Sequence, residues 1–394
     1  MTPALSRQAI TGILIITLFT VSATAAQAQH RLFGGWRSDC CPPPPCQTVE
    51  PVKPPTETKP GEAPGPETAP RLTEPSLAPE RFAAAGGGTV ALATPNMQGD
   101  QLGIPALSFS SQFTSFKGAT GQQIVLVPSV RSFKISENES PRPQDRAYVG
   151  FNYFNDVNKA VNNRLGADFL RLHVFRETFG VEKTCLDQNA SVGLRLPLNT
   201  LTSDSNVPGA ARTDTDIGDL SIILKYAFLS DAQGDLLSAG LAVTAPTGPD
   251  AFASSPFVTT LHSTILQPYV GYILSLNELY IHGFCAVDVP TDARDVTLLH
   301  NDIGVGYFVY RSQSDSRLVS AVAPTFEVHV NTPLNHRGGF NFGDTAGTPD
   351  WVDLTMGINV GVKRQCSLAV GIVTPVTGPK PFDFEVLTQL NVRF

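Results

Sequence analysis

LSIILKYAFL, residues 220–229, carries an apolar side chain at every second position from Leu220 to Phe228. Ser221 and Lys225 lie at intervening positions. Successive side chains of a β-strand point to opposite faces, so a two-residue period is typical of a strand. The stretch therefore predicts a strand with one apolar face and one face that includes polar groups.

The same alternation recurs along the chain after about residue 120, between stretches rich in Gly, Pro, Asn and Asp. Bacterial single-chain barrels have an even number of strands, so about twelve are expected, with ten to fourteen allowed. The candidate segments number one more than twelve, which indicates one false segment or a missed strand near 105–116. The candidate segments are 124–135, 146–155, 169–182, 188–198, 217–229, 236–246, 264–275, 278–288, 301–311, 317–330, 351–364, 367–376 and 381–394.

The polar face of these segments distinguishes a membrane barrel from a soluble sandwich. It consists mostly of Gly, Ser, Ala, Thr and Asn, and charged residues make up only 16% of the chain. Soluble domains contain about 25% charged residues, and a sandwich would place many of them on its wet face. The apolar face is long enough for a tilted membrane strand of about 9–11 residues. We therefore expect an all-β fold, a single transmembrane antiparallel up-and-down β-barrel over residues 101–394, with a soluble sandwich as the alternative.

Aromatic residues near the ends of these strands are candidates for the interfacial girdles of a membrane barrel. Ordinary packing in a core or loop is the alternative for each of them. The candidates are Tyr226, Phe228, Tyr307, Tyr310, Trp351 and Phe382.

The N-terminal quarter predicts export followed by a region without a core. Arg7, the apolar run 10–21 and Ala26-Gln27-Ala28 are typical of a cleaved signal peptide over residues 1–28. Residues 29–100 are rich in Pro and Gly and poor in apolar residues, which predicts a disordered periplasmic linker. Within it, the Pro-rich tract 42–80 is either a spacer or a contact for the cell wall. Export and a barrel together indicate the outer membrane, whose lipid would be a partner.

The chain ends in PFDFEVLTQLNVRF, residues 381–394, with aromatic and aliphatic residues on one face and Phe394 last. This segment resembles the C-terminal strand that outer-membrane barrels present to the barrel assembly machinery. The resemblance implies that Phe394 is an assembly signal and that this machinery is a partner.

Other stretches resemble a known family. DIGDLSIILKYAFL (216–229), LSAGLAVTAPTG (237–248) and LQPYVGYIL (266–274) are similar to the large outer-membrane barrel family associated with phenol degradation, of the MetA type. Residues 137–156 and 179–198 look like members of this type from planctomycete-like bacteria. The resemblance covers about residues 120–394 and implies a barrel with a transport or channel role. It supplies neither a catalytic motif nor a solute.

The register of the alternation places several titratable side chains on the inner face of the barrel. Such groups set charge selectivity or bind a solute in pores, although solvated or paired residues inside the barrel are the simpler interpretation. The lumen-facing candidates are Asp219, Lys225, Glu327, His329, Asp353, Lys363, Glu385 and Arg393.

The sequence favours a passive channel or transporter for small or hydrophobic solutes. A structural or adhesive barrel with a Pro-rich arm is the second hypothesis. An enzyme is the third, suggested only by His262-Ser263 and His300-Asn301-Asp302, neither of which lies in a nucleophile motif. The net charge of −7 argues against a nucleic-acid partner, and no motif predicts a metal or cofactor.

Overall fold

The computed structural model describes residues 94–100, 110–115, 122–127, 133–165, 169–205, 212–249, 258–259, 262–312, 314, 316–339, 344, 346–363 and 365–394. All of these residues belong to one compact unit of the chain. The predicted signal peptide, the Pro-rich tract and most of the predicted linker lie outside the described residues.

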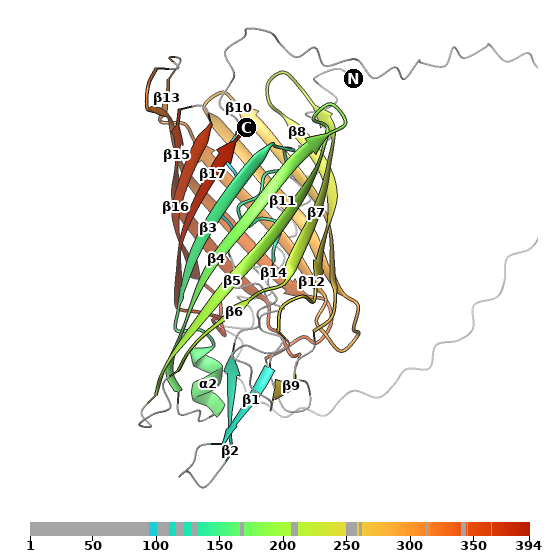
Figure 1. Ribbon diagram of the computed structural model, residues 1–394, viewed down its shortest axis with the longest axis vertical. Helices are drawn as coiled ribbons and strands as arrows, with labels where there is room; N and C mark the ends of the chain where they lie inside the picture. Colours follow the sequence, from blue (N-terminus) through green and yellow to red (C-terminus); the bar gives the residue numbers. More distant parts are fainter. Residues whose placement is uncertain are drawn as a thin grey trace, which may run out of the picture. The chain divides into compact units, whose positions relative to one another are not determined.

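Twelve antiparallel strands form a closed barrel (Figure 1). Neighbours in sequence pair with one another, β12 pairs with β14, and the first and last barrel strands close the ring. This confirms the predicted up-and-down topology. The barrel strands are β3 (Arg146–Asn155), β4 (Phe169–Cys185), β5 (Ala190–Ser205), β7 (Leu220–Ser230), β8 (Leu236–Ala245), β10 (Ile265–Leu276), β11 (Leu279–Pro290), β12 (Leu298–Tyr307), β14 (Val319–Pro333), β15 (Trp351–Val362), β16 (Cys366–Pro375) and β17 (Phe384–Arg393).

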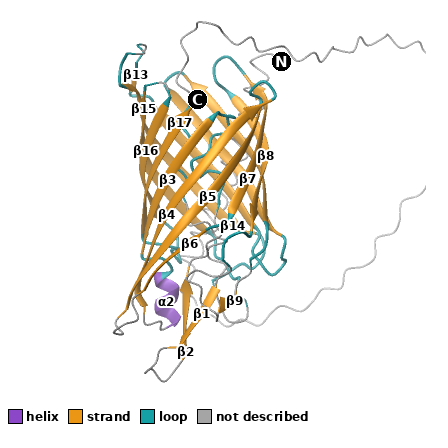
Figure 2. Cartoon of the chain, in the orientation of Figure 1, coloured by secondary structure: helices purple, strands orange, loops and turns teal. Residues whose placement is uncertain are grey.

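Within the described part of the chain, five short strands and one helix lie outside this ring of twelve. β6 (Arg212–Ile217) extends the sheet beside β5, and β13 (Tyr310–Arg311) pairs with β14. A helix, α2 (Lys159–Leu165), follows β3 in the connection to β4 (Figure 2). β1 (Ser110–Ser115), β2 (Gln122–Val127) and β9 (Val258–Thr259) form a small separate sheet, described next.

The extra candidate strand at 124–135 is not part of the barrel. β2 (Gln122–Val127) pairs with β1 (Ser110–Ser115) in the small sheet, and β1 also pairs with β9. The suspected strand near 105–116 is therefore present as β1, but it too lies outside the barrel. The barrel begins at Arg146.

The connections differ in length at the two ends of the barrel. β4–β5, β7–β8, β10–β11 and β15–β16 are joined by turns of two to five residues, and the end of the barrel that carries them is called the short-turn end. The opposite end carries most of the longer connections, including α2 and the small sheet (Figure 1), and is called the long-loop end, although the β12–β14 connection, residues 308–318, lies at the short-turn end.

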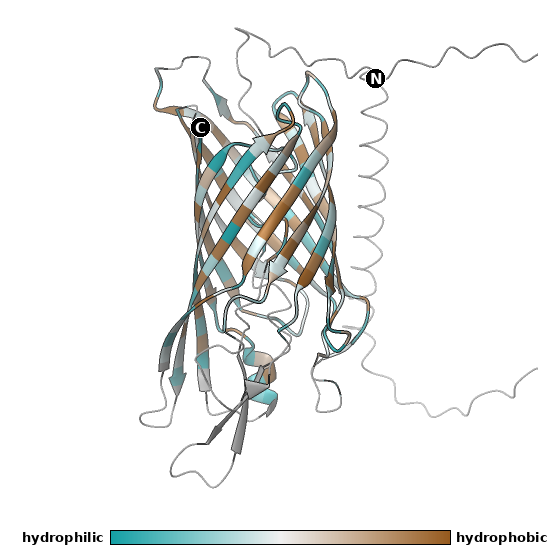
Figure 3. Ribbon diagram, turned by 45° about the vertical axis from the view of Figure 1, so that its right-hand side comes forward, coloured by the Kyte–Doolittle hydropathy of each residue, from teal (hydrophilic) through white to brown (hydrophobic). Residues whose placement is uncertain are grey.

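Side chains alternate between the two faces of the barrel wall. In β7, Leu224 and Tyr226 are exposed on the outside, whereas Ile223 and Lys225 are buried. Figure 3 shows hydrophobic and hydrophilic residues alternating along the strands in this way. The outer face is apolar on every side of the ring, as its exposed residues show: Val149, Phe151, Val181, Val192, Leu194, Ile222, Leu266, Val305, Met356, Ile358, Val370, Ile372, Leu390 and Val392.

Four of the six aromatic girdle candidates are on the outside, near the short-turn end. Tyr226, Phe228, Tyr307 and Tyr310 are exposed there. The other two candidates were wrong, because both are buried. The Trp351 indole donates a hydrogen bond to Asp353, and the Phe382 ring packs edge-on against Phe154. Trp351 is 4% exposed and Phe382 is 2% exposed.

Inward tyrosines pack over glycines of the neighbouring strand. The Tyr148 ring lies where a Cβ at Gly180, its cross-strand partner, would be. A larger residue at such a glycine would overlap the ring, so each pair fixes two strands against each other. The same arrangement occurs for Tyr269 with Gly240, Tyr272 with Gly283, and Tyr280 with Gly306.

Among the described residues, no helix is both long and apolar enough to cross a membrane. Within the same part of the chain, Cys185, Cys285 and Cys366 are free thiols.

Candidate functional site

Two segments of the chain lie inside the barrel, where they are buried against its inner wall. The entering segment is residues 94–100, and the returning segment is residues 133–145, which leads directly into β3. Met97, Gln98 and Ile135 are completely buried. The predicted linker ended at residue 100, so its last seven residues are part of this interior structure.

The two segments run in opposite directions along the lumen. Asn96 donates a hydrogen bond to Asn391 near the end of β17, at the short-turn end. Asp100 accepts one from Asn331, which lies toward the long-loop end of β14. The returning segment follows the reverse path, because Phe133 O accepts a hydrogen bond from Gln267 near the start of β10, and Asp145 lies next to Arg146.

Polar groups of the wall bind the backbone of the entering segment. The amides of Gln98 and Gly99 donate to the Glu327 carboxylate over 2.9 and 3.0 Å. Gln389 donates to Gln98 O over 2.6 Å, and Thr355 donates to Gly99 O over 2.9 Å. A backbone buried inside a barrel requires such partners, so the wall supplies what a regular sheet would otherwise provide.

Two paired glycines leave room for the Gln98 side chain. Gly357 of β15 and Gly371 of β16 are cross-strand partners, and a Cβ at either position would overlap the Gln98 amide. The missing side chains allow the entering segment to approach the wall closely.

A buried lysine connects the returning segment, the entering segment and the wall. The Lys134 ammonium lies 2.5 Å from Asp100 Oδ1 and 2.7 Å from Asp302 Oδ1 of β12. His329 Nδ1 of β14 is 2.9 Å from the same Asp302 oxygen. Asp100, Asp302 and His329 could offer three metal ligands within 4.8 Å of one another. The Lys134 ammonium contacts both carboxylates and offsets one of their two negative charges.

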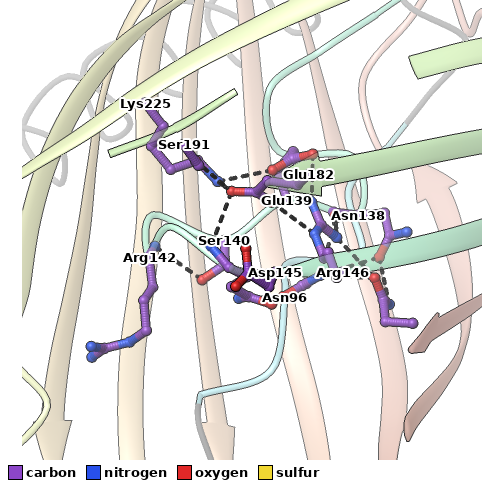
Figure 4. Close-up of polar contacts among 12 residues, drawn as sticks. Asn96, Asn138, Glu139, Ser140, Arg142, Asp145, Arg146, Glu182, Ser191 and Lys225 are labelled. Atoms are coloured by element: carbon purple, nitrogen blue, oxygen red, sulfur yellow. Dashed lines mark hydrogen bonds and ion pairs between the residues drawn. The ribbon is translucent and has the colours of Figure 1, made fainter. Parts of the chain in front are cut away.

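Carboxylates of the returning segment meet cations of the wall at a second position (Figure 4). The Arg146 guanidinium is 2.6 Å from Glu139 and 2.8 Å from Glu182 of β4. The Lys225 ammonium of β7 is 3.1 Å from Glu139 and 3.0 Å from Glu182. Arg195 of β5 is 2.5 Å from Glu137. We refer to Arg146, Arg195 and Lys225 as the basic cluster.

An apolar cluster fixes the segments to another part of the wall. Burial of the apolar side chains in this cluster removes apolar area from water. It therefore contributes a non-directional attraction between segments and wall, in addition to that of the ion pairs. The cluster joins Met97, Phe133 and Ile135 of the segments to Ile223, Ala242, Tyr269, Phe284 and Ala286 of β7, β8, β10 and β11.

Opposite charges of the wall are largely separated around the ring. Among the described barrel strands, buried Lys and Arg side chains are found only on β3, β4, β5 and β7, as Arg146, Arg176, Arg195 and Lys225. Apart from Glu182, the buried carboxylates of the same described strands lie on β11 to β17, as Asp288, Asp302, Glu327, Asp353 and Glu385. The segments complement this pattern, with Lys134 on the acidic side and Glu137 and Glu139 on the basic side.

The structure places the predicted lumen residues in three environments. Asp219, Lys225, Glu327, His329, Asp353 and Glu385 are buried at 3% exposure or less. Arg393 is partly buried at the short-turn end, where its Nε lies 3.4 Å from Gln144. Lys363 is not lumen-facing: it is exposed in the turn between β15 and β16, with a φ of 52°. The chain reverses at Lys363, which ends the alternation on which that prediction depended.

The histidines considered for catalysis have acidic or amide partners. His262 Nε2 is 2.9 Å from Asp219, whereas Ser263 Oγ is directed toward Asp295 at 3.5 Å. His300 is buried, with Nδ1 2.7 Å from Asn331 and Nε2 3.1 Å from Asp288. These contacts orient the two imidazoles, and the Ser263 hydroxyl is directed toward Asp295 rather than His262.

The interior segments were missed by sequence reasoning. Their partners are far away in the chain: Gln98 and Glu327 are 229 residues apart, and Arg195 and Glu137 are 58 apart. The one available signal was the pair Glu137 and Glu139 beside Lys134, in a stretch that failed to keep a strand period.

No family profile and no curated protein matches the sequence. Solved structures similar to the barrel include the COG4313 outer membrane channel from Pseudomonas putida F1, with 12% identity, a TM-score of 0.45, and coverage of 64% of this chain and 96% of that one. The KdgM porin has 8% identity, a TM-score of 0.37, and coverage of 63% and 99%. The β domain of the Bordetella autotransporter BrkA has 12% identity, a TM-score of 0.39, and coverage of 64% and 99%.

Proposed function

We propose that this chain is an outer-membrane channel for small polar solutes, whose closed form is held by its own entering and returning segments. The observation that carries the proposal is the lumen itself: a ring with an apolar exterior encloses a wall rich in charged groups. The segments are held there through side-chain contacts that can dissociate, such as the Lys134–Asp302 ion pair at 2.7 Å. Displacement of the segments would leave a polar passage.

The lining favours polar solutes over the hydrophobic ones that the sequence allowed. Arg146, Arg176 and Arg195 are each 1% exposed or less and project into the lumen. An apolar solute passing these groups would strip them of partners without replacing any hydrogen bond, which is costly. A polar solute would exchange one set of partners for another.

The orientation follows from the loops. Membrane barrels of bacteria place short turns in the periplasm and long loops outside. The short-turn end would therefore be periplasmic, and β17 would end there with Phe394, which is 65% exposed and available to the barrel assembly machinery. A cleaved signal peptide over residues 1–28 and the MetA-type resemblance belong to this proposal.

Planar-bilayer recordings test the channel directly. We expect the wild-type protein to show low or intermittent conductance, since the segments fill the lumen. Gly357→Leu should raise the open probability, because the new side chain occupies the place of Gln98. Val370→Leu is the matched control, because it enlarges an exposed outer residue on the adjacent strand. If neither wild type nor Gly357→Leu conducts while both form folded barrels, the channel proposal is wrong.

The dense packing of the lumen also favours a second, non-enzymatic candidate. An impermeable barrel would serve as an anchor, with the Pro-rich tract 42–80 contacting the cell wall. Deletion of residues 42–80 should then weaken the envelope and leave the folded barrel intact. An unchanged sensitivity of cells to detergent after the deletion would contradict this candidate.

A further inference from the structure

We propose that the basic cluster is a binding site for small carboxylate solutes, and that Glu137 and Glu139 occupy it as internal ligands in the closed form. The inference deepens the proposed function and rests on it, since the solute reaches the cluster only when the returning segment leaves. The class of solute that fits best is a small dicarboxylate.

The contacts of the two glutamates are those of a bound ligand. Glu139 lies between two cations from different strands, Arg146 at 2.6 Å and Lys225 at 3.1 Å (Figure 4). Glu137 contacts a third, Arg195, at 2.5 Å. All three cationic side chains are 3% exposed or less. Distances of this size are typical of charge-assisted hydrogen bonds, in which guanidinium groups match carboxylate geometry.

The charge balance of the basic cluster requires two negative charges in addition to Glu182. The basic cluster supplies three positive charges, and Glu182, which contacts Arg146 and Lys225, supplies one negative charge. Glu137 and Glu139 neutralise the remaining two. When the returning segment leaves, the negative charges of Glu137 and Glu139 leave with it, and the loss of a carboxylate partner is unfavourable for a buried cation. One dicarboxylate restores the balance that the two glutamates provide.

The cluster is also built to hold its shape without the segment. Ser191 donates to Glu182 over 2.7 Å, and Glu182 in turn bridges Arg146 and Lys225. These residues belong to β3, β4, β5 and β7, which are consecutive in the ring. The wall therefore fixes the positions of Arg146 and Lys225 independently of Glu139, which is a property of a preformed site.

The first experiment removes the internal ligands. In the full-length protein, Glu137→Gln/Glu139→Gln keeps the side-chain shapes and removes both charges, so an added dicarboxylate no longer competes with them. Succinate binding is measured by isothermal titration calorimetry in detergent or nanodiscs. We expect succinate to bind the variant at least about tenfold more tightly than the wild type, equivalent to ~1.4 kcal/mol. Equal binding to both proteins would overturn the proposal.

Controls separate the cluster from general charge effects. Glu177→Gln/Glu278→Gln removes two carboxylates from outside the lumen, at a partly exposed outer position of β4 and in the β10–β11 turn. This variant should bind succinate as the wild type does. Adding Arg195→Gln/Lys225→Gln to the Glu137/Glu139 variant should abolish the gain. Ethylenediamine, a dication of similar length, should not bind the Glu137/Glu139 variant more tightly than it binds the wild type. Inorganic phosphate, measured in the same way, tests whether the site accepts any dianion.

A second variant and a second measurement keep the proposal testable if the Glu137→Gln/Glu139→Gln variant fails to fold. Glu137→Gln alone breaks only the contact with Arg195 and should give a smaller gain in the same direction. Ion selectivity is recorded separately, as the reversal potential in a KCl gradient. This potential should shift toward anion selectivity in the double variant. A barrel that conducts without this shift or this binding contradicts only the carboxylate site. A barrel that binds succinate without conducting contradicts only the channel.

Discussion

Lys134→Met tests how firmly the lumen segments are held. The substitution keeps most of the side-chain volume and removes the ammonium that contacts Asp100 and Asp302. The Lys134 side chain is 2% exposed, and its partners Asp100 and Asp302 are 2% and 0% exposed. The variant therefore leaves two negative charges facing each other, without the cation that separated them.

The structure sets the size of the effect. Removing one partner of a buried ion pair costs about 3–5 kcal/mol. Uptake of a proton by one carboxylate offsets part of this, so we use the lower value. At about 1.4 kcal/mol per factor of ten, the population with undocked segments should rise about a hundredfold. The cost falls on docking, because Lys134 is outside the strand pairs that close the ring.

Hydrogen exchange measures this population. The amides of Met97, Gln98 and Gly99 are bonded to Glu139 and Glu327 only while the entering segment is docked. Their exchange rates should rise about a hundredfold in Lys134→Met, in proportion to the undocked fraction, while strand amides keep their protection. Lys183→Met is the matched control, because Lys183 has a 66% exposed side chain paired with Asp145, and such pairs contribute about 0–1 kcal/mol.

Two results would refute the reasoning. A rise in exchange below about threefold would correspond to less than 1 kcal/mol and show that the Lys134 contacts do not hold the segments. An equal rise in the amides of β12 and β14 would show that the segments and the barrel open together, rather than separately.

The remaining predictions concern the wall and its ends. Leu224→Arg, at an exposed outer position in the middle of β7, should destabilise the barrel by about 2–4 kcal/mol in a bilayer. The control Gln233→Arg, in the β7–β8 turn, should have little effect. Urea titrations in liposomes measure both. Gly240→Ala should cost about 1–3 kcal/mol in the same titration, because its Cβ would overlap Leu224 O and the Tyr269 ring; an unchanged midpoint would count against the packing of tyrosine on glycine. Asp145 accepts hydrogen bonds from the Thr184 amide and hydroxyl, which lower its pKa below the usual 3.8. The stabilisation from the Asp145 carboxylate is therefore complete above pH 3.8 and is lost as the pH falls through the lower pKa of the folded state. The stability difference between wild type and Asp145→Asn should stay constant from about pH 5 to 8 and shrink below pH 3.8.

The barrel strands were predictable from sequence because an apolar outer face and a polar inner face require opposite polarities on alternate residues. The predicted segments 236–246 and 351–364 correspond closely to β8 (Leu236–Ala245) and β15 (Trp351–Val362). The alternation fails where the chain turns, which is why Lys363 was placed on the wrong face.

The interior segments could not be predicted in the same way. The entering segment obtains its hydrogen bonds from Glu327, Thr355 and Gln389, which are remote in sequence, and it has no period of its own. The segment 124–135 contains an alternating run that forms β2 in the small sheet instead of a barrel strand. Local pattern identifies a strand, but the choice of its partner depends on contacts across the whole fold.

Spin-label accessibility in lipid bilayers tests most directly whether the apolar face meets lipid. Nitroxides are attached at Ile358 and Ile372, which are 42% and 54% exposed on the outer face, and at Lys380 in the exposed β16–β17 loop, in a protein whose six native cysteines are replaced by serine. Labels at Ile358 and Ile372 should collide frequently with oxygen, which partitions into lipid, and rarely with a water-soluble nickel chelate, whereas the Lys380 label should show the reverse. Nickel accessibility at Ile358 and Ile372 equal to that at Lys380 would place the face in water and contradict the membrane barrel.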